Sequence, residues 1–390
     1  MTSNKYLAFL NNYDIRPCKA QYLWWYYYLQ DHLPNTHFIL NEDYLNPNKN
    51  RWEIAKYETA PYKYKNPAEL SPKNLTVLPR VTELPELREE EVPSVILKKV
   101  MLEPIPSIVD AVSKVLETEK ITASISWCNN ASVEYACRVH KIPAIHNESG
   151  ALRSPRFKDT CYFDFSGVNG NTEFDQRFNY FKYLVRLGKV KIFSREELLR
   201  IVTPKANLDY ILGLDKIKPT YECGVAMQVD VDTNLIAFNK GFQEADVVNM
   251  AAKKYNDSLL IRNHPLSSIG YIKPASIGLG KVDDSANSLE FLVKCKRIYT
   301  LNSSVAFEAM LFGREVKILG DNPFYSMQFM DKETRLLALN FAIFGYLMPT
   351  KRLYDEKYYN FRMQCLYPAS GQDEEVIYNE GQRYWLENTD

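Results

Sequence analysis

Short apolar segments alternate with amphipathic segments along residues 223–319, and the connections between them are short. The expected strands are Cys223–Val229, Ser258–Arg262, Arg297–Leu301 and Glu315–Leu319. The expected helices are Lys240–Tyr255, Ser288–Cys295 and Ser303–Phe312. Strands that alternate with helices in this way predict a parallel sheet with helices on both faces. This alternation constrains the fold more than any other feature of the chain.

A shorter run of the same pattern lies in the N-terminal half. The expected elements are a helix at Ser107–Thr118, a strand at Ile121–Trp127, a helix at Ala131–His140 and a strand at Ile142–His146. The charged stretch Arg195–Arg200 is also expected to be helical. Before these elements, residues 61–106 hold eight of the 20 prolines, and we expect an irregular excursion there because proline interrupts helices and sheets.

The fold class expected from both halves is therefore α/β, with two Rossmann-like domains that face each other across a cleft. The stretch GLDKIKPTY interrupts the pattern near residue 216. We place the N-terminal domain at 1–215, including the proline-rich excursion at 61–106, and the C-terminal domain at 216–350. The remaining residues, 351–390, are expected to pack back on the N-terminal domain.

The charge balance excludes some classes of protein. Lys and Arg number 48 and Asp and Glu also number 48, so the formal net charge is zero. Proteins that bind nucleic acid usually carry a basic excess to neutralise phosphates, so we expect no nucleic-acid partner. Aromatic residues make up 13% of the chain, with 27 tyrosines, which suits sugar clefts, interfaces and membrane surfaces equally well.

The seven cysteines are scattered and show neither C-x-x-C spacing nor a neighbouring histidine at metal-ligand spacing. Reduced thiols in a cytoplasmic protein are the expected state. The N-terminus lacks the apolar core of a signal peptide. The longest apolar run, Leu336–Met348, is too short to span a bilayer, so we expect no membrane-spanning helix and leave peripheral attachment open.

The window RIYTLNSSVAFEAMLFGREVKILG, residues 297–320, is the most informative for function. A strand ends before Asn302, and Ser303 or Ser304 is placed to cap the next helix, where free N–H groups and hydroxyls favour an anion. Glu308 lies four residues after Ser304, on the same helix face, where its carboxylate can accept hydrogen bonds from ribose hydroxyls. The competing interpretation is an ordinary serine cap and a partly exposed glutamate.

A second polar group follows the apolar strand in SLLIRNHP, residues 258–265. Arg262, Asn263 and His264 are expected at the carboxyl end of a parallel strand, where open α/β sheets bind ligands. His264 could donate a hydrogen bond to a phosphate or a carboxylate, with Arg262 or Lys273 as a nearby cation. A purely structural histidine is the alternative.

A third group follows the strand in CGVAMQVDVD, residues 223–232. It contains Gln228, Asp230 and Asp232, and residues two apart on a strand point the same way. One aspartate could serve as a nucleophile or base while the other caps the next turn, although aspartate also commonly ends strands without any catalytic role.

In IHNESGALR, residues 145–153, Glu148 and Arg153 flank a turn that contains glycine. They are expected to face the second domain, and an incidental ion pair is the alternative. The chain contains no G-x-G-x-x-G, Walker, G-x-S-x-G or H-E-x-x-H motif, so dinucleotide, NTPase, hydrolase and zinc-protease functions have no support.

In combination, four blocks resemble the capsule-polysaccharide family of Kdo transferases (the KpsC, KpsS and WbbB type), which use 3-deoxy-D-manno-oct-2-ulosonic acid (Kdo). The blocks are W-C-N to A-L-R at 127–153, Q-V-D-V-D at 228–232, R-N-H-P at 262–265 and T-L-N-S-S to I-L-G at 300–320. The resemblance covers roughly residues 130–325. It implies a GT-B glycosyltransferase fold, with an acceptor-side N-terminal domain and a C-terminal domain that binds the CMP-sugar.

The resemblance also implies roles for particular residues. Asp232 would be the catalytic nucleophile and Glu148 the acid/base. Arg153 would lie on the acceptor side. His264 would be a further catalytic residue. The residues that would bind the donor are Gln228, Arg262, Asn263, Lys273, Asn302, Ser303, Ser304 and Glu308.

The activity implied is transfer of Kdo from CMP-β-Kdo to a glycan acceptor with retention, by double displacement through an adduct on Asp232. The acceptor would be an oligosaccharide or a lipid-linked glycan of O-antigen or capsule synthesis. No metal or other cofactor is implied, and the D-x-D sequence at 230–232 is interpreted as the nucleophile segment. The implied location is cytoplasmic, with peripheral contact at the inner membrane left open, as is a place within a larger polysaccharide synthase.

Two alternatives remain open at this stage. One is a GT-B transferase with another donor, such as CMP-sialic acid or a UDP-sugar. The other is a GT-B module that binds glycan without catalysis. The aromatic stretch Tyr22–Tyr28 is expected in the core, with membrane or acceptor contact as its alternative.

Overall fold

The computed structural model describes residues 4–10, 23–45, 74–88, 90, 92–229, 232–264, 278–365 and 371–388. The chain divides into two compact units. Unit 1 comprises residues 1–148, 163–168 and 351–366, and unit 2 comprises residues 149–162, 169–350 and 367–390. These units are not divided at residue 216. The expected boundary between two domains at that residue stays a prediction.

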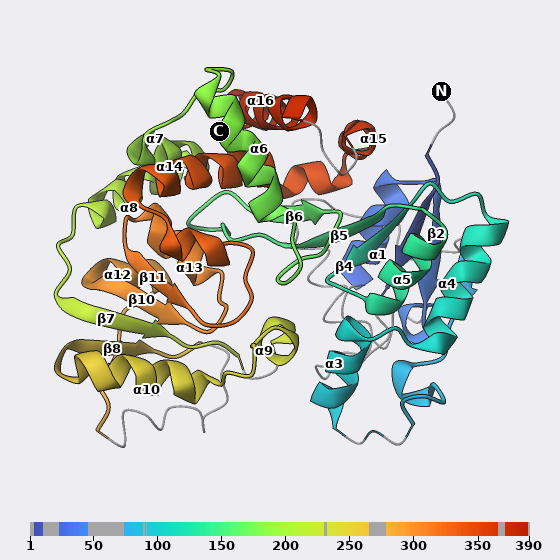
Figure 1. The fold of residues 1–390 in the computed structure, drawn as a ribbon, viewed down its shortest axis with the longest axis horizontal. Helices are drawn as coiled ribbons and strands as arrows, with labels where there is room; N and C mark the ends of the chain where they lie inside the picture. The colour runs from blue at the N-terminus through green and yellow to red at the C-terminus, as the bar shows by residue number, and fades with distance from the viewer. Residues whose placement is uncertain are drawn as a thin grey trace. The chain divides into compact units, whose positions relative to one another are not determined.

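Two sheets organise the described residues, and almost all their strand pairs are parallel (Figure 1). The larger sheet has the order β12-β6-β5-β4-β1-β2-β3. Its strands are β1 (Tyr6–Phe9), β2 (Thr36–Leu40), β3 (Leu75–Val77), β4 (Ala123–Trp127), β5 (Ala144–Ser149), β6 (Thr160–Asp164) and β12 (Leu347–Pro349). β1, β2, β3, β4 and β5 pair in parallel, whereas β12 pairs with β6 antiparallel.

The smaller sheet has five strands in the order β11-β10-β7-β8-β9, and all four of its pairs are parallel. Its strands are β7 (Tyr221–Ala226), β8 (Leu259–Arg262), β9 (Lys281–Val282), β10 (Cys295–Thr300) and β11 (Glu315–Ile318). Parallel pairing in both sheets confirms the α/β fold class expected from the alternating pattern.

Helices connect the strands in both units. Unit 1 contains α1 (Leu23–His32), α3 (Pro93–Leu102), α4 (Pro106–Thr118), α5 (Ala131–Val139) and α15 (Glu356–Gln364). Unit 2 contains α6 (Phe174–Arg186), α7 (Arg195–Val202), α8 (Leu208–Asp215), α9 (Thr233–Ala237), α10 (Glu244–Tyr255), α12 (Ser288–Lys294), α13 (Val305–Leu311), α14 (Lys332–Phe341) and α16 (Gly371–Glu387). Single helical turns of other types lie at Glu42–Leu45, Val81–Glu83, Lys205–Asn207, Asn256–Ser258, Tyr325–Phe329, Ala342–Tyr346 and Thr350–Tyr354. None of the helices within the described ranges is long and apolar enough to cross a bilayer.

The expected elements of both α/β runs are present, with shifts of a few residues at their ends. The largest shift is in α10, which begins at Glu244 and not at Lys240. Lys240 and Gly241 have φ angles of 54° and 82°, in the left-handed region that a right-handed helix excludes. Gln243 and Asp246 then form a reciprocal capping box that starts the helix.

The expectation of irregular structure throughout 61–106 is wrong for its last part. Pro93 and Pro106 each stand at the first position of a helix, α3 and α4. Proline is tolerated there because the first helical N–H has no partner within the helix, and the fixed φ of proline suits the helical turn. Residues 61–73 lie outside the described residues.

The core of unit 2 near the smaller sheet forms between β7, β8 and α10, which lies alongside these strands in Figure 1. Val225 and Ile261 of the strands are fully buried against Val247 and Ala251 of the helix. In unit 1, Trp25, Tyr26, Tyr27 and Tyr28 of α1 are at most 2% exposed, which confirms the core role expected for these members of the aromatic stretch.

The C-terminal segment is shared between the two units. In unit 1, the Tyr359 hydroxyl of α15 donates a hydrogen bond to Asn147 Oδ1 (3.0 Å). In unit 2, α16 packs beside α6, and Arg177 pairs with Glu374. The segment 351–390 is therefore divided between the two units, and both of these contacts are with residues of the expected N-terminal domain, 1–215.

Candidate functional site

Three neighbouring strands of the smaller sheet end close to the residues singled out in the sequence. β7 ends two residues before Gln228, β8 ends two residues before His264, and β10 ends two residues before Asn302. Because β10, β7 and β8 are adjacent and parallel, their carboxyl ends lie at one edge of the sheet. That edge is where open α/β sheets bind ligands.

Gln228 and Asn302 join two of these strand ends directly. The backbone N–H of Asn302 donates to Gln228 Oε1 (3.0 Å), and Gln228 Nε2 donates to Asn302 Oδ1 (2.9 Å). Both side chains are buried, at 4% and 1% exposure. Buried amides are costly unless their polar atoms are paired, so this reciprocal contact holds the loop after β7 against the loop after β10.

Asp232 lies within this same frame. It is the N-cap of α9, and its Oδ1 accepts a hydrogen bond from the Asn234 N–H (2.9 Å). Asn302 Nδ2 donates to the carbonyls of Asn234 (2.9 Å) and Phe238 (3.2 Å), so the amide pair also fixes α9. Asp232 is half-buried, and within the described part of the chain its Oδ2 has no hydrogen-bond partner. Asp230 lies outside the described residues.

Gly320, the last residue of the 300–320 block, lies against the same frame. A Cβ at this position would lie 2.7 Å from the Phe238 carbonyl oxygen and 3.3 Å from Asn302 Cβ. Only glycine allows the chain after β11 to approach this closely.

Glu244 is a residue that sequence reasoning missed. Its side chain is 5% exposed, and Oε2 accepts a hydrogen bond from the Gln228 N–H (3.1 Å). Burial raises the pKa of Glu244 from 4.5 to about 7, the hydrogen bond from Gln228 acts to lower it, and the charge of Asp232 acts to raise it. Nothing in the sequence distinguishes it from an ordinary acidic residue in the first turn of a helix.

The serines after β10 are partly buried and use few of their hydrogen-bonding groups on the helix. Ser303 Oγ accepts from the Val305 N–H (3.3 Å), whereas Ser304, the N-cap of α13, makes no side-chain cap. The expected helix at Ser303–Phe312 is a seven-residue helix, Val305–Leu311. Within the described residues neither hydroxyl donates a hydrogen bond, so both hydroxyl protons are available to a further acceptor.

Glu308 is buried, at 8% exposure, contrary to the alternative that it is partly exposed. Burial raises its pKa from 4.5 to about 7, while the guanidiniums of Arg156 and Arg153 and a hydrogen bond with Ser288 act to lower it. Arg156 Nη1 in turn donates to Ser288 Oγ (3.0 Å). One carboxylate oxygen of Glu308, Oε2, has no hydrogen-bond partner among the described residues.

Sequence reasoning paired Glu308 with the serines of its own helix and missed Arg156 and Ser288. Arg153 was singled out, but for the acceptor side. It donates from Nε to the Gly150 carbonyl (3.0 Å), and its charge acts on Glu308. The approach of residues 153–156 to α13 depends on tertiary packing within unit 2, which spacing along the chain does not reveal.

The polar group after β8 is only partly described. Arg262 Nη1 donates to Asp283 Oδ2 (2.5 Å) and to the Ser285 carbonyl (2.9 Å), so its charge is already balanced inside the protein. Asn263 and His264 are half-buried, and Lys273 lies outside the described residues. Donor binding by Arg262 remains a prediction, which this ion pair weakens.

Glu148 belongs to unit 1, near the end of β5, and its Oε2 accepts a hydrogen bond from Cys128 Sγ (2.6 Å). Within the described residues, no three or more His, Cys, Asp or Glu side chains form a group that could hold a metal ion. Since Asp230 is outside those residues, the D-x-D sequence is not covered by this observation.

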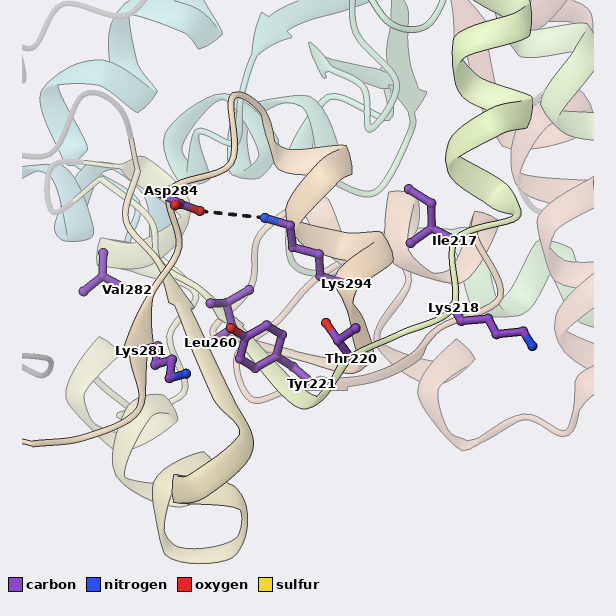
Figure 2. Close-up of a pocket in the computed structure, with 9 residues that line it drawn as sticks. All are labelled: Ile217, Lys218, Thr220, Tyr221, Leu260, Lys281, Val282, Asp284 and Lys294. Atoms are coloured by element: carbon purple, nitrogen blue, oxygen red, sulfur yellow. Dashed lines mark ion pairs between the residues drawn. The ribbon is translucent and has the colours of Figure 1, made fainter.

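A hollow of about 500 Å³ lies elsewhere in unit 2 and is shown in Figure 2. Its lining residues are Ile217, Lys218, Thr220, Tyr221, Leu260, Lys281, Val282, Asp284 and Lys294. Thr220 and Tyr221 mark the amino end of β7, opposite the edge with Gln228. Lys294 is paired with Asp284 (3.8 Å) and donates to Ser285 Oγ (2.7 Å), so its charge is partly balanced within the protein. The hollow is therefore not part of the site at the carboxyl edge.

Two segments of the chain match known protein families. Residues 8–173 match the glycosyltransferase 99 family N-terminal domain, and residues 245–355 match the capsule polysaccharide biosynthesis protein family. The chain therefore contains one segment similar to a glycosyltransferase family and one similar to a capsule polysaccharide biosynthesis family. These matches confirm the resemblance predicted from the sequence, and the second one includes the strand ends that carry His264 and Asn302. No curated protein gives a significant match.

Solved structures similar to this chain include two from Thermosulfurimonas dismutans. The KpsC beta Kdo 2,7 transferase is 13% identical, with a TM-score of 0.40, and the match covers 70% of this chain and 96% of that one. The KpsC beta Kdo 2,4 transferase is 14% identical, with a TM-score of 0.35 and coverage of 56% and 79%. A UDP-GlcNAc 2-epimerase from Methanocaldococcus jannaschii is 13% identical, with a TM-score of 0.31 and coverage of 86% and 91%. These TM-scores are too low for the likeness to say anything about activity.

Proposed function

We propose that this protein is a glycosyltransferase that transfers Kdo from CMP-β-Kdo to a glycan acceptor with retention, and that Asp232 is the nucleophile. The observation that carries the proposal is the state of the Asp232 carboxylate. One oxygen is held by the Asn234 N–H, the other has no hydrogen-bond partner among the described residues, and the segment is braced by the Gln228–Asn302 pair. A carboxylate that is oriented by one oxygen and open at the other suits nucleophilic attack.

Donor binding is assigned to the strand ends and to α13. Ser303, Ser304 and His264 would hold the CMP phosphate or the Kdo carboxylate, because their hydroxyl and imidazole groups can donate to anionic oxygens. Glu308 would accept hydrogen bonds from the ribose through its unpartnered oxygen. Lys273, Asn263 and Arg262 complete the proposed set. We add Arg156, because its charge acts on the Glu308 carboxyl group.

The proposed reaction has two displacements. The Asp232 carboxylate attacks the anomeric carbon of Kdo, a carbon–oxygen bond forms, and the bond to the CMP phosphate breaks so that CMP leaves with the electron pair. The acceptor hydroxyl then attacks the same carbon from the other face, its proton goes to the Glu148 carboxylate, and Asp232 leaves as a carboxylate. Two inversions give net retention.

The remaining parts of the proposal rest on the family resemblance. The enzyme works without a metal ion, since serine, histidine and arginine side chains would bind the anionic groups of the substrate. It acts in the cytoplasm with peripheral contact at the inner membrane, on an oligosaccharide or lipid-linked acceptor of capsule or O-antigen synthesis, by itself or as part of a larger synthase.

Nucleotide preference is the first test. CMP should raise the melting temperature, because a ligand that binds the native state stabilises it, whereas UDP and GDP should not. A shift with UDP in place of CMP would favour a UDP-sugar donor. CMP-sialic acid and CMP-Kdo, each supplied with a synthetic acceptor and excess EDTA, then identify the sugar that is transferred.

The adduct is the second test. Incubation with CMP-Kdo without acceptor should add one anhydro-Kdo residue to the intact protein, localised by peptide mass spectrometry to Asp232. Asp232→Asn should abolish the adduct, and Asp331→Asn should not. Asp331 is a matched control because it caps α14 as Asp232 caps α9, accepting from the Thr334 N–H (2.7 Å). Full transfer by Asp232→Asn would rule out the double displacement, and binding of CMP without any transfer would indicate a module that binds donor without catalysis.

A further inference from the structure

The loop after β7, which leads to Asp232, is hydrogen-bonded to the carboxyl group of Glu244, a residue outside the site residues assigned above. Glu244 opens α10, and its Oε2 accepts the Gln228 N–H at 3.1 Å. The other oxygen, Oε1, is buried and has no hydrogen-bond partner among the described residues. An acidic residue in a first helical turn is ordinarily exposed to solvent and interacts with the N–H groups of its own helix. Glu244 instead lies inside unit 2 and contacts the loop after β7.

A continuous series of hydrogen bonds connects this carboxyl group to the two ends of α9. Glu244 binds the backbone of Gln228, and the Gln228 side chain exchanges two hydrogen bonds with Asn302. Asn302 Nδ2 then binds the carbonyls of Asn234 and Phe238, at the beginning and just after the end of α9. Asp232 is the N-cap of that helix. These hydrogen bonds therefore connect the Glu244 carboxyl group to the helix that Asp232 caps.

We propose that Glu244 is a positioning residue for Asp232, acting through the Gln228 N–H and the Gln228–Asn302 pair. The proposal rests on the function proposed above, since it assumes that Asp232 attacks the donor. We assign Glu244 a positioning role and no donor contact, because its Oε2 already accepts the hydrogen bond from the Gln228 N–H.

The electrostatic relation between the two carboxyl groups supports this role. The charge of Asp232 acts to raise the pKa of Glu244, and the same interaction opposes a second negative charge beside Asp232. A neutral acceptor at position 244 is therefore compatible with a charged Asp232. Glutamine, which is neutral and of the same shape, should replace glutamate in this role.

Two variants separate the loss of the acceptor from the loss of the side-chain volume. Glu244→Gln keeps an acceptor oxygen for the Gln228 N–H, and Glu244→Met fills the same space without one. We expect Glu244→Gln to stay within about threefold of the wild-type kcat. We expect Glu244→Met to lose about 10²-fold in kcat with little change in KM for CMP-Kdo, because a small displacement of the attacking group slows the chemical step far more than it weakens donor binding.

Asp246→Ala is the matched control. Asp246 lies in the same first turn of α10, but it is exposed and accepts from the Gln243 N–H (2.7 Å). It should lower stability through the lost cap and leave kcat unchanged. If Glu244→Met and the wild type have the same kcat and form the Asp232 adduct at the same rate, the positioning role is wrong while the proposed function stands.

Hydrogen exchange supplies a readout that does not depend on activity. The Gln228 amide should exchange faster in Glu244→Met than in the wild type and Glu244→Gln, measured on overlapping peptides that begin or end at Gln228. Unchanged exchange in Glu244→Met would overturn the proposal. If the wild type transfers no Kdo, the proposed function fails, and the exchange comparison still decides whether Glu244 holds the Gln228 backbone.

Discussion

The side chain of Gln228 and the backbone and side chain of Asn302 exchange two hydrogen bonds, of 3.0 Å and 2.9 Å, between the ends of adjacent strands β7 and β10. The two residues are 74 positions apart in the chain. Asn302 also donates hydrogen bonds to carbonyls at both ends of α9. The segment with Asp232 is therefore linked to the loop with Ser303 and Ser304.

The first prediction concerns this amide pair. Gln228→Ala should lower the free energy of unfolding by about 1–3 kcal/mol, because it leaves the buried Asn302 N–H without an acceptor. Asn302→Ala should cost a similar amount. The double variant should cost less than the sum of the two, by about 0.5–3 kcal/mol, in urea denaturation. Additive effects would mean that the two residues do not stabilise each other.

The second prediction separates the two roles of Asp232. Asp232→Asn should change the free energy of unfolding by less than about 0.5 kcal/mol, because asparagine caps helices as well as aspartate does. Kdo transfer should fall by at least about 10³-fold, as expected when a nucleophile is removed. Asp232→Ala should lose about 1 kcal/mol as well, because it also removes the cap on the Asn234 N–H. Equal activity in Asp232→Asn and the wild type would remove Asp232 from the mechanism.

The third prediction concerns pH. The pKa of Glu308 is raised from 4.5 to about 7 in the folded state, so the folded protein binds more protons than the unfolded chain between these values. The stabilisation of the folded state by this group is complete below pH 4.5 and is lost as the pH rises through about 7. Glu308→Gln should remove that loss and be more stable than the wild type at pH 8, by up to about 3 kcal/mol from the 1.36 kcal/mol per pKa unit.

Denaturant unfolding at pH 5 and pH 8 provides the measurement for Glu308. Glu333→Gln is the control, since Glu333 is an exposed glutamate in the first turn of α14. A Glu308→Gln variant with the same pH dependence as the wild type would show that Glu308 keeps an ordinary pKa.

The fourth prediction concerns the ion pair that joins α6 and α16. Arg177 Nε donates to Glu374 Oε2 (2.8 Å) and Nη2 donates to Oε1 (3.0 Å), and both side chains are almost fully buried. Arg177→Met should cost about 3–5 kcal/mol, because it leaves the Glu374 charge buried without this partner. Arg177→Met combined with Glu374→Met should recover most of that loss.

An exposed pair serves as the comparison for Arg177. Arg383 pairs with Glu380 (2.7 Å) on the surface of α16, where screening by solvent keeps such interactions weak. Arg383→Met should therefore change the free energy of unfolding by less than about 1 kcal/mol. A similar cost for Arg177→Met and Arg383→Met would contradict the structural importance of the buried pair.

The strands and helices of the smaller sheet could be predicted closely, because their signals are local. β8 and β11 end within one residue of the expected positions, since apolar runs bounded by polar residues mark buried strands. The start of α10 was misplaced because the left-handed conformation of Lys240 has no strong sequence signal. The proline-rich stretch was misjudged because proline at the first position of a helix and proline in a loop look alike in composition.

The residues of the candidate site also fall into those that the sequence predicted and those that it did not. Asp232, Asn302, Ser303 and Ser304 could be chosen from the sequence because each follows a predicted strand, and Gln228 lies near the carboxyl end of one. Parallel strands place such residues at one edge of the sheet. Glu244 and Arg156 could not, because their roles depend on what packs against them. The ion pair of Arg262 with Asp283 could not be predicted from the sequence either, because the two residues come together only through the pairing of β9 with β8.

The sequence by itself determined the α/β class and the strand ends that carry the polar residues, because hydrophobic periodicity and turn chemistry act over a few neighbouring residues. Only the tertiary structure decided which of these side chains are buried, paired or left with an open oxygen. Burial and electrostatics depend on distances between residues that are far apart in the chain. For that reason Glu244 and Glu308, ordinary glutamates in the sequence, become carboxyl groups with raised pKa values in the folded protein.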